Sequence, residues 1–187
     1  MDEYKAIKIG LVGDANIGKS SLVSLISKEE LPKIYTPTIG VDLRILYIDD
    51  KKLKLTFWDL SGQTMFKDLV DNFVRSMDVI CFCFSCDSMS SYTYIKNLYD
   101  EYTKNNIIQN KVCILLLTKI DKSTDLNYKL LGIDFSREKH IPFFMTSSLQ
   151  KIGCLDFLNY VIKFYSPNIT TEEKPQKSKN IFECILS

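Results

Sequence analysis

The sequence lacks several features that particular classes of protein require. Its longest apolar runs, around Val79–Phe84 and Val112–Leu117, are far shorter than the roughly 20 residues of a membrane-spanning helix. Its acidic start, MDEYKAIKIGLVG, has neither the basic segment nor the cleavage site of a secretory signal. We therefore expect a soluble, cytoplasmic protein without a spanning segment.

Histidine is almost absent, and the cysteines do not form a metal-binding pattern. His140 is the only histidine, and Cys83-x-x-Cys86 has no second cysteine pair at ligand spacing. A chain of 187 residues needs no disulfides for stability, so its six cysteines indicate a reducing compartment. We therefore interpret Cys83 and Cys86 as the end of a buried strand rather than a zinc or redox site.

Neither sign of charge dominates. The chain carries 24 lysine and arginine residues against 23 aspartate and glutamate residues, so nothing in its overall charge indicates a nucleic-acid partner. The length fits one domain plus a tail, and 45% hydrophobic residues can form one sizeable core. The polar segment from residue 167 onward has no core signal. We predict a folded domain over 1–166 and a flexible tail over 167–187.

Strand-like apolar runs alternate with helical patterns, which is typical of an α/β sheet. The short polar turn at Asp49–Lys51 joins two strands, so we expect that pair to be antiparallel. Two later strands are apolar on both faces, as buried parallel strands are. The expected strands are residues 5–12, 41–48, 52–59, 78–84, 111–117 and 141–145. The expected helices are residues 18–28, a segment containing Tyr92, Ile95, Leu98 and Tyr102, and residues 152–165.

One motif carries specific chemistry on its own. Gly13-Asp14-Ala15-Asn16-Ile17-Gly18-Lys19-Ser20 matches G-x4-G-K-[ST] and lies between an apolar strand and an amphipathic helix. Its glycines let backbone N–H groups face phosphates, and the following helix N-terminus attracts anions. Lys19 is expected to reach the β and γ phosphates, Ser20 to bind Mg2+, and Ser21 to complete the site. Taken alone, the motif leaves a kinase, an ATPase and a GTPase open.

Two further segments resemble the switches of small GTPases of the Ras superfamily, a resemblance that covers about residues 5–166. They are Tyr35-Thr36-Pro37-Thr38-Ile39-Gly40-Val41-Asp42 and Trp58-Asp59-Leu60-Ser61-Gly62-Gln63, the latter usually WDTAGQ. The resemblance implies that Tyr35 contacts the nucleotide and that Thr38 senses the γ-phosphate and binds Mg2+. It also implies that Asp59 holds Mg2+ through water, that the Gly62 amide contacts the γ-phosphate, and that Gln63 orients the attacking water.

Two more segments resemble the guanine-binding motifs of the same superfamily. Thr118-Lys119-Ile120-Asp121 resembles N/T-K-x-D, and Thr146-Ser147-Ser148-Leu149 resembles TSAK. An aspartate suits guanine because it accepts from both the ring N–H and the exocyclic amine. The resemblance implies that Asp121 reads the base and that the stem of Lys119 lies along it. Thr118, Ser147, Ser148 and Leu149 then complete the pocket.

The phrase Ile39-Gly40-Val41-Asp42 after Thr38 looks most like a Rab. The implied fold is a P-loop NTPase G domain, an α/β fold. Its mixed six-stranded sheet has one antiparallel edge strand and helices on both faces. Some positions depart from the family pattern: Leu31 replaces a phenylalanine that packs on the guanine edge, Leu149 replaces the lysine of TSAK, and Ala15 lies where a larger group would crowd an arginine finger.

The C-terminus, Cys184-Ile185-Leu186-Ser187, fits a C-a-a-X prenylation signal, and serine at its last position suggests farnesyl. Most Rabs end instead in paired cysteines. A single isoprenoid gives only marginal membrane binding, and the tail adds no net positive charge. We therefore expect Cys184 to carry a prenyl group that attaches the protein reversibly to the cytosolic face of endomembranes, with a soluble carrier that shields the lipid.

Together these features predict a GTP/GDP switch with slow GTP hydrolysis that acts in vesicle and membrane traffic. Gln63 and Lys19 are the expected catalytic residues, and Ser20, Thr38 and Asp59 the expected Mg2+ site. The expected partners are an exchange factor, a GTPase-activating protein, and effectors that bind through residues 31–42 and 59–76. The alternatives are a Ras-type signalling GTPase at the plasma membrane, a GTP-binding module with little turnover, and a P-loop kinase or ATPase for a small substrate.

Overall fold

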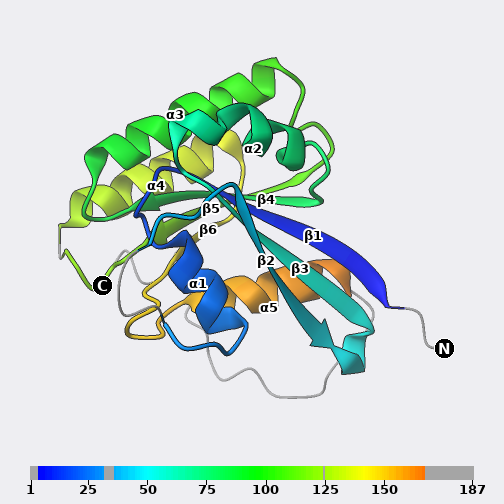
Figure 1. The fold of residues 1–187 in the computed structure, drawn as a ribbon. Helices are drawn as coiled ribbons and strands as arrows, with labels where there is room; N and C mark the ends of the chain where they lie inside the picture. The colour runs from blue at the N-terminus through cyan, green and yellow to red at the C-terminus, as the bar shows by residue number, and fades with distance from the viewer. Residues whose placement is uncertain (1–3, 32–35, 124, 167–187) are drawn as a thin grey trace.

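A six-stranded sheet forms the centre of the computed structural model, which describes residues 4–31, 36–123 and 125–166 (Figure 1). The strand order is β2-β3-β1-β4-β5-β6. Strand β2 pairs antiparallel with β3, and every other pair is parallel, which confirms the predicted mixed sheet with one antiparallel edge strand. The strands are β1 Lys5–Val12, β2 Val41–Ile48, β3 Leu53–Leu60, β4 Val79–Ser85, β5 Val112–Thr118 and β6 Phe143–Met145.

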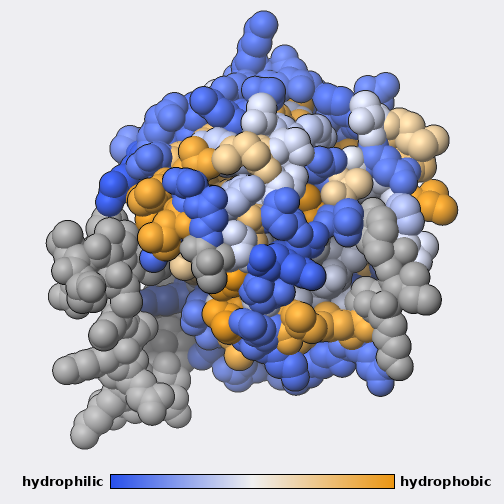
Figure 2. Space-filling view, turned by 90° about the vertical axis from the view of Figure 1, so that its left-hand side faces the viewer, coloured by the Kyte–Doolittle hydropathy of each residue, from blue (hydrophilic) through white to orange (hydrophobic). Residues whose placement is uncertain are grey.

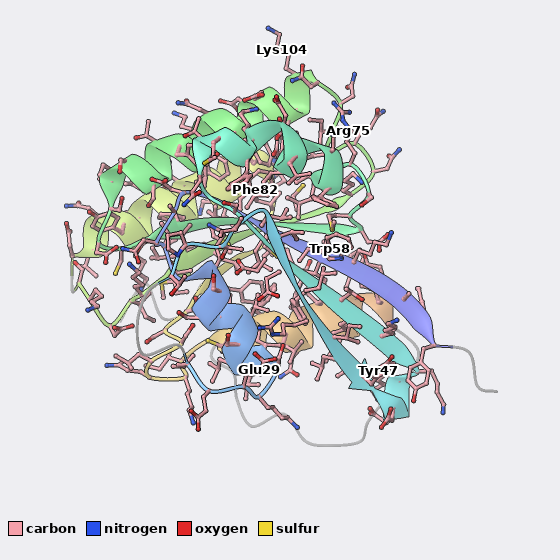
Figure 3. All side chains as sticks on the ribbon, in the orientation of Figure 1. Glu29, Tyr47, Trp58, Arg75, Phe82 and Lys104 are labelled. Atoms are coloured by element: carbon pink, nitrogen blue, oxygen red, sulfur yellow. The ribbon has the colours of Figure 1, made fainter. Side chains whose placement is uncertain are left out.

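Helices cover both faces of this sheet (Figure 1). On one face, α1 (Lys19–Ile26) and α5 (Cys154–Tyr165) pack on an apolar cluster that includes Phe57 and Cys81. On the other face, α2 (Lys67–Val74), α3 (Met89–Lys104) and α4 (Leu126–Lys139) pack on a second cluster. Phe82 belongs to this second cluster and lies between the sheet and the overlying helices in Figure 3.

The sequence located the strands closely and the helices less completely. The first two strands have the predicted bounds, and the others begin one or two residues later than predicted. The polar turn after β2 is a short 3-10 helix, Asp49–Lys51, and a second one, Thr64–Phe66, precedes α2. Helices α2 and α4 were not predicted. Of the helices in the described segments, none combines the length and apolarity that crossing a membrane requires.

Cys83 and Cys86 lie where the sequence placed them. Cys83 is inside β4 and fully buried, and Cys86 follows the end of that strand with 3% of its surface exposed. Burial raises the pKa of the Cys83 thiol to about 12, so it stays protonated at neutral pH. Among the described residues, no three or more histidine, cysteine, aspartate or glutamate side chains form a group that could hold a metal ion. The prediction of a buried strand end is confirmed.

A polar cluster links α2 to α3. The phenol of Tyr102 donates to Asp71 Oδ1 at 2.6 Å, and Lys67 Nζ donates to Asp71 Oδ2 at 2.8 Å and to Glu101 Oε1 at 2.6 Å. Tyr102 is fully buried. Burial, together with the Asp71 carboxylate, raises the pKa of Tyr102 well above its ordinary value, so its phenol remains a donor. These bonds fix the side of α2 that faces α3.

Tyr102→Phe removes the donor from this cluster and leaves the ring in place. Because a hydrogen bond to a charged group contributes about 2 kcal/mol, we expect the free energy of unfolding to fall by roughly that amount. Urea unfolding measures it. Tyr47→Phe is the matched control, since Tyr47 is half exposed and the substitution keeps its ring. Equal stabilities of the Tyr102→Phe protein and the wild type would show that the bond to Asp71 contributes nothing.

Candidate functional site

The loop between β1 and α1 lines a cleft of about 660 Å³. Gly13 has a φ of +145°, and a Cβ at this position would lie 2.3 Å from the carbonyl oxygen of Cys83, so only glycine fits. Gly18 is the N-cap of α1, and no side chain caps that helix. The first N–H groups of α1 are therefore open to an acceptor of another kind, such as an anion.

Lys19 is a buried cation in the wall of this cleft. Its surface is 6% exposed, and its Nζ donates to the carbonyl oxygens of Gly13 at 2.9 Å and of Asp14 at 2.7 Å. Burial lowers the pKa of the Lys19 ammonium, although Asp59 and Asp14 oppose the shift. Neutral carbonyls solvate a buried ammonium only in part, so an anion in the cleft would stabilise Lys19 in its charged form.

Three oxygen-bearing side chains from different elements meet beside Lys19. Ser20 Oγ lies 3.2 Å from Thr38 Oγ1, and the Thr38 hydroxyl donates to Asp59 Oδ2 at 3.2 Å. Asp59 is 2% exposed, and its other carboxylate oxygen, Oδ1, is buried without a hydrogen-bond partner among the described residues. Burial raises the pKa of Asp59 above its ordinary value. The hydrogen bonds to Asp59 and the charge of Lys19 lower that pKa, but they do not cancel the effect of burial.

This oxygen triad fits a magnesium ion. Mg2+ takes oxygen ligands at about 2.1 Å in an octahedron, which places neighbouring oxygens about 2.9 Å apart. The 3.2 Å separation of Ser20 Oγ and Thr38 Oγ1 is close to that spacing. The unpartnered Oδ1 of Asp59 is an acceptor that a metal-bound water can satisfy. The donor set is therefore of the kind that Mg2+ prefers.

The segment after β3 lies directly on the phosphate loop. A Cβ on Gly62 would come within 2.3 Å of the Ala15 amide nitrogen and of the Asp14 carbonyl carbon, so this contact requires glycine. Gln63 follows, and its backbone N–H donates to Ser61 Oγ at 3.2 Å. Ser61 Oγ thus shapes the turn that places Gln63 in the lining of the cleft.

The loop after β5 is fastened to the phosphate loop and to β4. Thr118 is 3% exposed, and its hydroxyl lies within hydrogen-bond reach of the carbonyl oxygens of Ile17 and Phe84. Lys119 has a φ of +55°, a left-handed conformation, and its side chain passes beside Gly18 into the cleft lining. These contacts place the side chain of Lys119 across the start of α1.

Asp121 and Ser147 also meet at this edge of the sheet. The Ser147 hydroxyl donates to Asp121 Oδ1, which orients the carboxylate. The loop that carries Ser147 is shaped by backbone hydrogen bonds in both directions between Ser147 and Ile152, each 3.0 Å long. The backbone of Thr146 links this loop to the previous one, since its carbonyl accepts from the Ile120 N–H at 3.2 Å.

The structure brings together most of the site residues that the sequence predicted. One cleft is lined by Ala15, Asn16, Ile17, Gly18, Lys19, Ser20, Ser21, Thr38, Asp59, Gly62, Gln63 and Lys119. The lining does not include Asp14, Thr118, Asp121, Ser147, Ser148 and Leu149. The Leu149 side chain is 70% exposed. The predicted residues Tyr35 and Cys184 fall outside the described residues. Figure 2 faces the side of the molecule that lies at the left of Figure 1 and shows hydrophilic residues in its centre, with separate apolar patches around them.

Sequence reasoning missed the residues that follow β4. The Cys86 thiol donates to the Lys119 carbonyl oxygen at 2.7 Å, and the Asp87 carboxylate accepts from Lys119 Nζ at 3.2 Å. The available signal was their position, because residues directly after a parallel strand lie at the same edge of the sheet as the other ligand-binding loops. No motif marks them.

Comparisons with known proteins agree with this arrangement. The family model described as "Ras family" matches residues 8–165. Ras-related protein RABC1 of Arabidopsis thaliana is 31% identical over 185 residues, which is 94% of this chain and 85% of the relative. Ras-related protein RabQ of Dictyostelium discoideum is 29% identical over 98% of this chain and 99% of the relative. Ras-related protein Rab-34 of Rattus norvegicus is 26% identical over 97% of this chain and 73% of the relative. The chain therefore belongs to the Ras family and is a Rab-like member of the small GTPase superfamily.

Proposed function

We propose that this chain is a molecular switch that binds GTP and GDP, hydrolyses GTP slowly, and acts in membrane traffic. The observation that carries the proposal is the meeting of Ser20, Thr38 and Asp59 beside the buried ammonium of Lys19. Hydroxyl and carboxylate oxygens next to a buried cation suit a triphosphate with its magnesium ion better than any uncharged ligand. Family membership supports the same function.

Phosphoryl transfer needs little covalent help from a protein, so the proposed catalysis is positioning and electrostatics. Lys19 neutralises charge that develops on the phosphates, and Gln63 orients the attacking water. Ser20 and Thr38, and Asp59 through a water molecule, would hold Mg2+, which would supply positive charge against the phosphates. We propose that a GTPase-activating protein speeds the slow intrinsic reaction by supplying an arginine.

The same residues explain how the chain reports which nucleotide it holds. The Thr38 hydroxyl lies 3.2 Å from both Ser20 Oγ and Asp59 Oδ2, so the first switch contacts the two other proposed metal-binding residues. The backbone at Gly62 rests on the phosphate loop. Loss of the γ-phosphate removes the ligand that both segments share, and each segment is then released.

Base recognition is assigned to the loops after β5 and β6. Asp121 Oδ1 is oriented by the Ser147 hydroxyl and has a second lone pair, so both carboxylate oxygens can accept from guanine N–H groups. Two acceptors on one carboxylate match the two donors on the guanine edge, and adenine does not offer that pair. The stem of Lys119 then lies along the face of the base.

An apolar surface joins the two switches and is proposed to bind effectors and regulators. Trp58 lies opposite Leu43 in the β2–β3 pair and packs against Phe73 of α2 at 5.2 Å between ring centroids. Leu43 is 45% exposed and Met65 is 79% exposed. Figure 3 shows Trp58 on β3 and Tyr47 toward the far end of the same hairpin. Exposed apolar side chains on and beside the two switch segments support this proposal, because exposed apolar patches are typical of protein-binding surfaces.

Attachment to membranes is assigned to Cys184. The C-a-a-X sequence supports a prenyl group there, and a single isoprenoid gives marginal, reversible binding. The lysines and glutamates of the segment 167–187 balance in charge, so they add little attraction for anionic lipids. We propose exchange between the cytosol and endomembranes, with a soluble carrier shielding the lipid.

The first test concerns the base. Asp121→Asn replaces a carboxylate that accepts two hydrogen bonds by an amide that presents a donor to guanine donors, so GDP and GTP affinity should fall on the order of tenfold or more. Affinity for xanthosine nucleotides should rise. Asp125→Asn is the matched control, because Asp125 caps α4 nearby and asparagine caps a helix equally well. Unchanged GDP affinity in Asp121→Asn would remove Asp121 as the guanine reader.

The second test concerns turnover. Single-turnover hydrolysis should be slow, on the order of 10⁻⁴ to 10⁻² per second, as for switches without a supplied arginine. Gln63→Leu should slow it further and leave nucleotide affinity nearly unchanged, because the side chain acts on water. Gln109→Leu, a change in an exposed loop remote from the cleft, serves as the control. Equal rates in Gln63→Leu and the wild type would exclude Gln63 from catalysis.

The third test concerns the membrane. Fractionation of cells that express the wild type should show a cytosolic pool and a membrane pool that resists salt extraction, because the lipid rather than charge holds the protein. Cys184→Ser should move the protein entirely into the cytosolic fraction and leave GDP binding unchanged. Membrane retention of the Cys184→Ser protein would contradict lipid attachment at this residue.

A further inference from the structure

The segment that follows β4 is bonded to the loop that follows β5. The Cys86 amide N–H donates to the Thr118 carbonyl at 3.1 Å, and the Cys86 thiol donates to the Lys119 carbonyl at 2.7 Å. The Lys119 carbonyl also accepts from the N–H of Lys122 at 2.8 Å. The backbone of Lys119 is thereby held in its left-handed conformation, with a φ of +55°. The direction in which the Lys119 side chain leaves the backbone is therefore fixed.

The far end of the Lys119 side chain is fixed as well. Its Nζ donates to Asp87 Oδ2 at 3.2 Å. Between its two ends the stem runs beside the phosphate loop, with Cγ 3.6 Å and Cε 3.9 Å from the position that a Cβ on Gly18 would occupy. Lysine has a flexible four-carbon stem, so the pair with Asp87 selects one extended path among many rotamers.

The Asp87 carboxylate is itself oriented. The Ser85 hydroxyl donates to Asp87 Oδ1, which turns Oδ2 toward Lys119. Ser85 in turn is anchored to the start of α3, because its amide N–H donates to Ser91 Oγ at 3.0 Å. Burial alone would raise the pKa of Asp87, but the hydrogen bonds from Ser85 and Lys119 outweigh it and lower that pKa, so the carboxylate is charged at neutral pH.

We propose that Asp87 is a positioning residue for nucleotide binding. It holds the Lys119 ammonium so that the apolar stem already lies along the path that a guanine base contacts, before the nucleotide arrives. The inference rests on the proposed guanine-nucleotide function and adds to it the residue that prepares the lysine. A stem ordered in advance loses less conformational freedom on binding, and it also opposes departure of the bound base.

The test is the rate of GDP release, followed by fluorescence of a GDP analogue that carries an N-methylanthraniloyl group. Asp87→Asn keeps the shape of the side chain and removes its charge. The side chains of the Lys119–Asp87 pair are 24% and 36% exposed, so the loss is that of a partly solvated ion pair, and we expect release about threefold to fivefold faster.

Two controls separate this role from a structural one. Asp100→Asn breaks a comparable pair, Lys139–Asp100 at 3.0 Å on the outer surface, and should leave GDP release unchanged. Lys119→Met keeps an apolar stem and removes the ammonium. In a Lys119→Met background, Asp87→Asn should have no further effect on release, because the charge that Asp87 holds is gone.

Three results would overturn the positioning role of Asp87. Release from Asp87→Asn at the wild-type rate, in a wild type that binds GDP tightly, overturns the positioning role and leaves the proposed function in place. An equal acceleration by Asp87→Asn with and without Lys119→Met also overturns it, since the effect would then arise from the packing of the loop. A wild type that retains no guanine nucleotide overturns the proposed function and this inference together.

Discussion

The parallel direction of β1, β3, β4, β5 and β6 is the constraint on which the site depends. Parallel pairing places the carboxyl ends of all these strands at one edge of the sheet, so the loops that follow them must converge there. Hydrogen bonds then fasten the converging loops to one another. The buried Thr118 hydroxyl reaches both Ile17 and Phe84, and the Thr146 carbonyl accepts from Ile120. The position of the cleft therefore follows from the sheet topology, and the local sequence of each loop supplies the side chains that line it.

Lys19 and Asp59 are buried ionisable groups at this edge of the sheet, and burial disfavours their charge. Burial lowers the pKa of Lys19 and raises the pKa of Asp59, so it disfavours the charged form of both residues. A buried acceptor of Asp59 lacks a partner among the described residues. Stability alone does not favour such an arrangement. Buried groups of opposite charge in a cleft are common where a charged ligand binds and offsets the cost of burying them. A phosphate beside Lys19 and a magnesium ion beside Asp59 would oppose these two shifts and favour the charged form of each side chain.

The sheet and the motif-bearing loops could be predicted because their signals are local. Continuous apolar runs and the G-x4-G-K-[ST] motif fix strands and the phosphate loop without tertiary information. Helix α4 could not be found this way, because its exposed face carries Leu126 and Leu130, which blurs the helical alternation. No motif marks Asp87, and its position after β4 does not reveal its role, since that role depends on a lysine contributed by the loop after β5. Sequence motifs do not identify residues that act through tertiary contacts.

The nucleotide that the purified protein carries shows most clearly whether the site is built for guanine. Protein purified in the presence of Mg2+ can be denatured, and the nucleotide that it releases can be identified and quantified by ion-exchange chromatography. We expect about one guanine nucleotide per chain, because a site closed by several loops releases its ligand slowly. Adenine nucleotide in that fraction would contradict it, as would a nucleotide-free protein that also fails to bind added GDP with Mg2+.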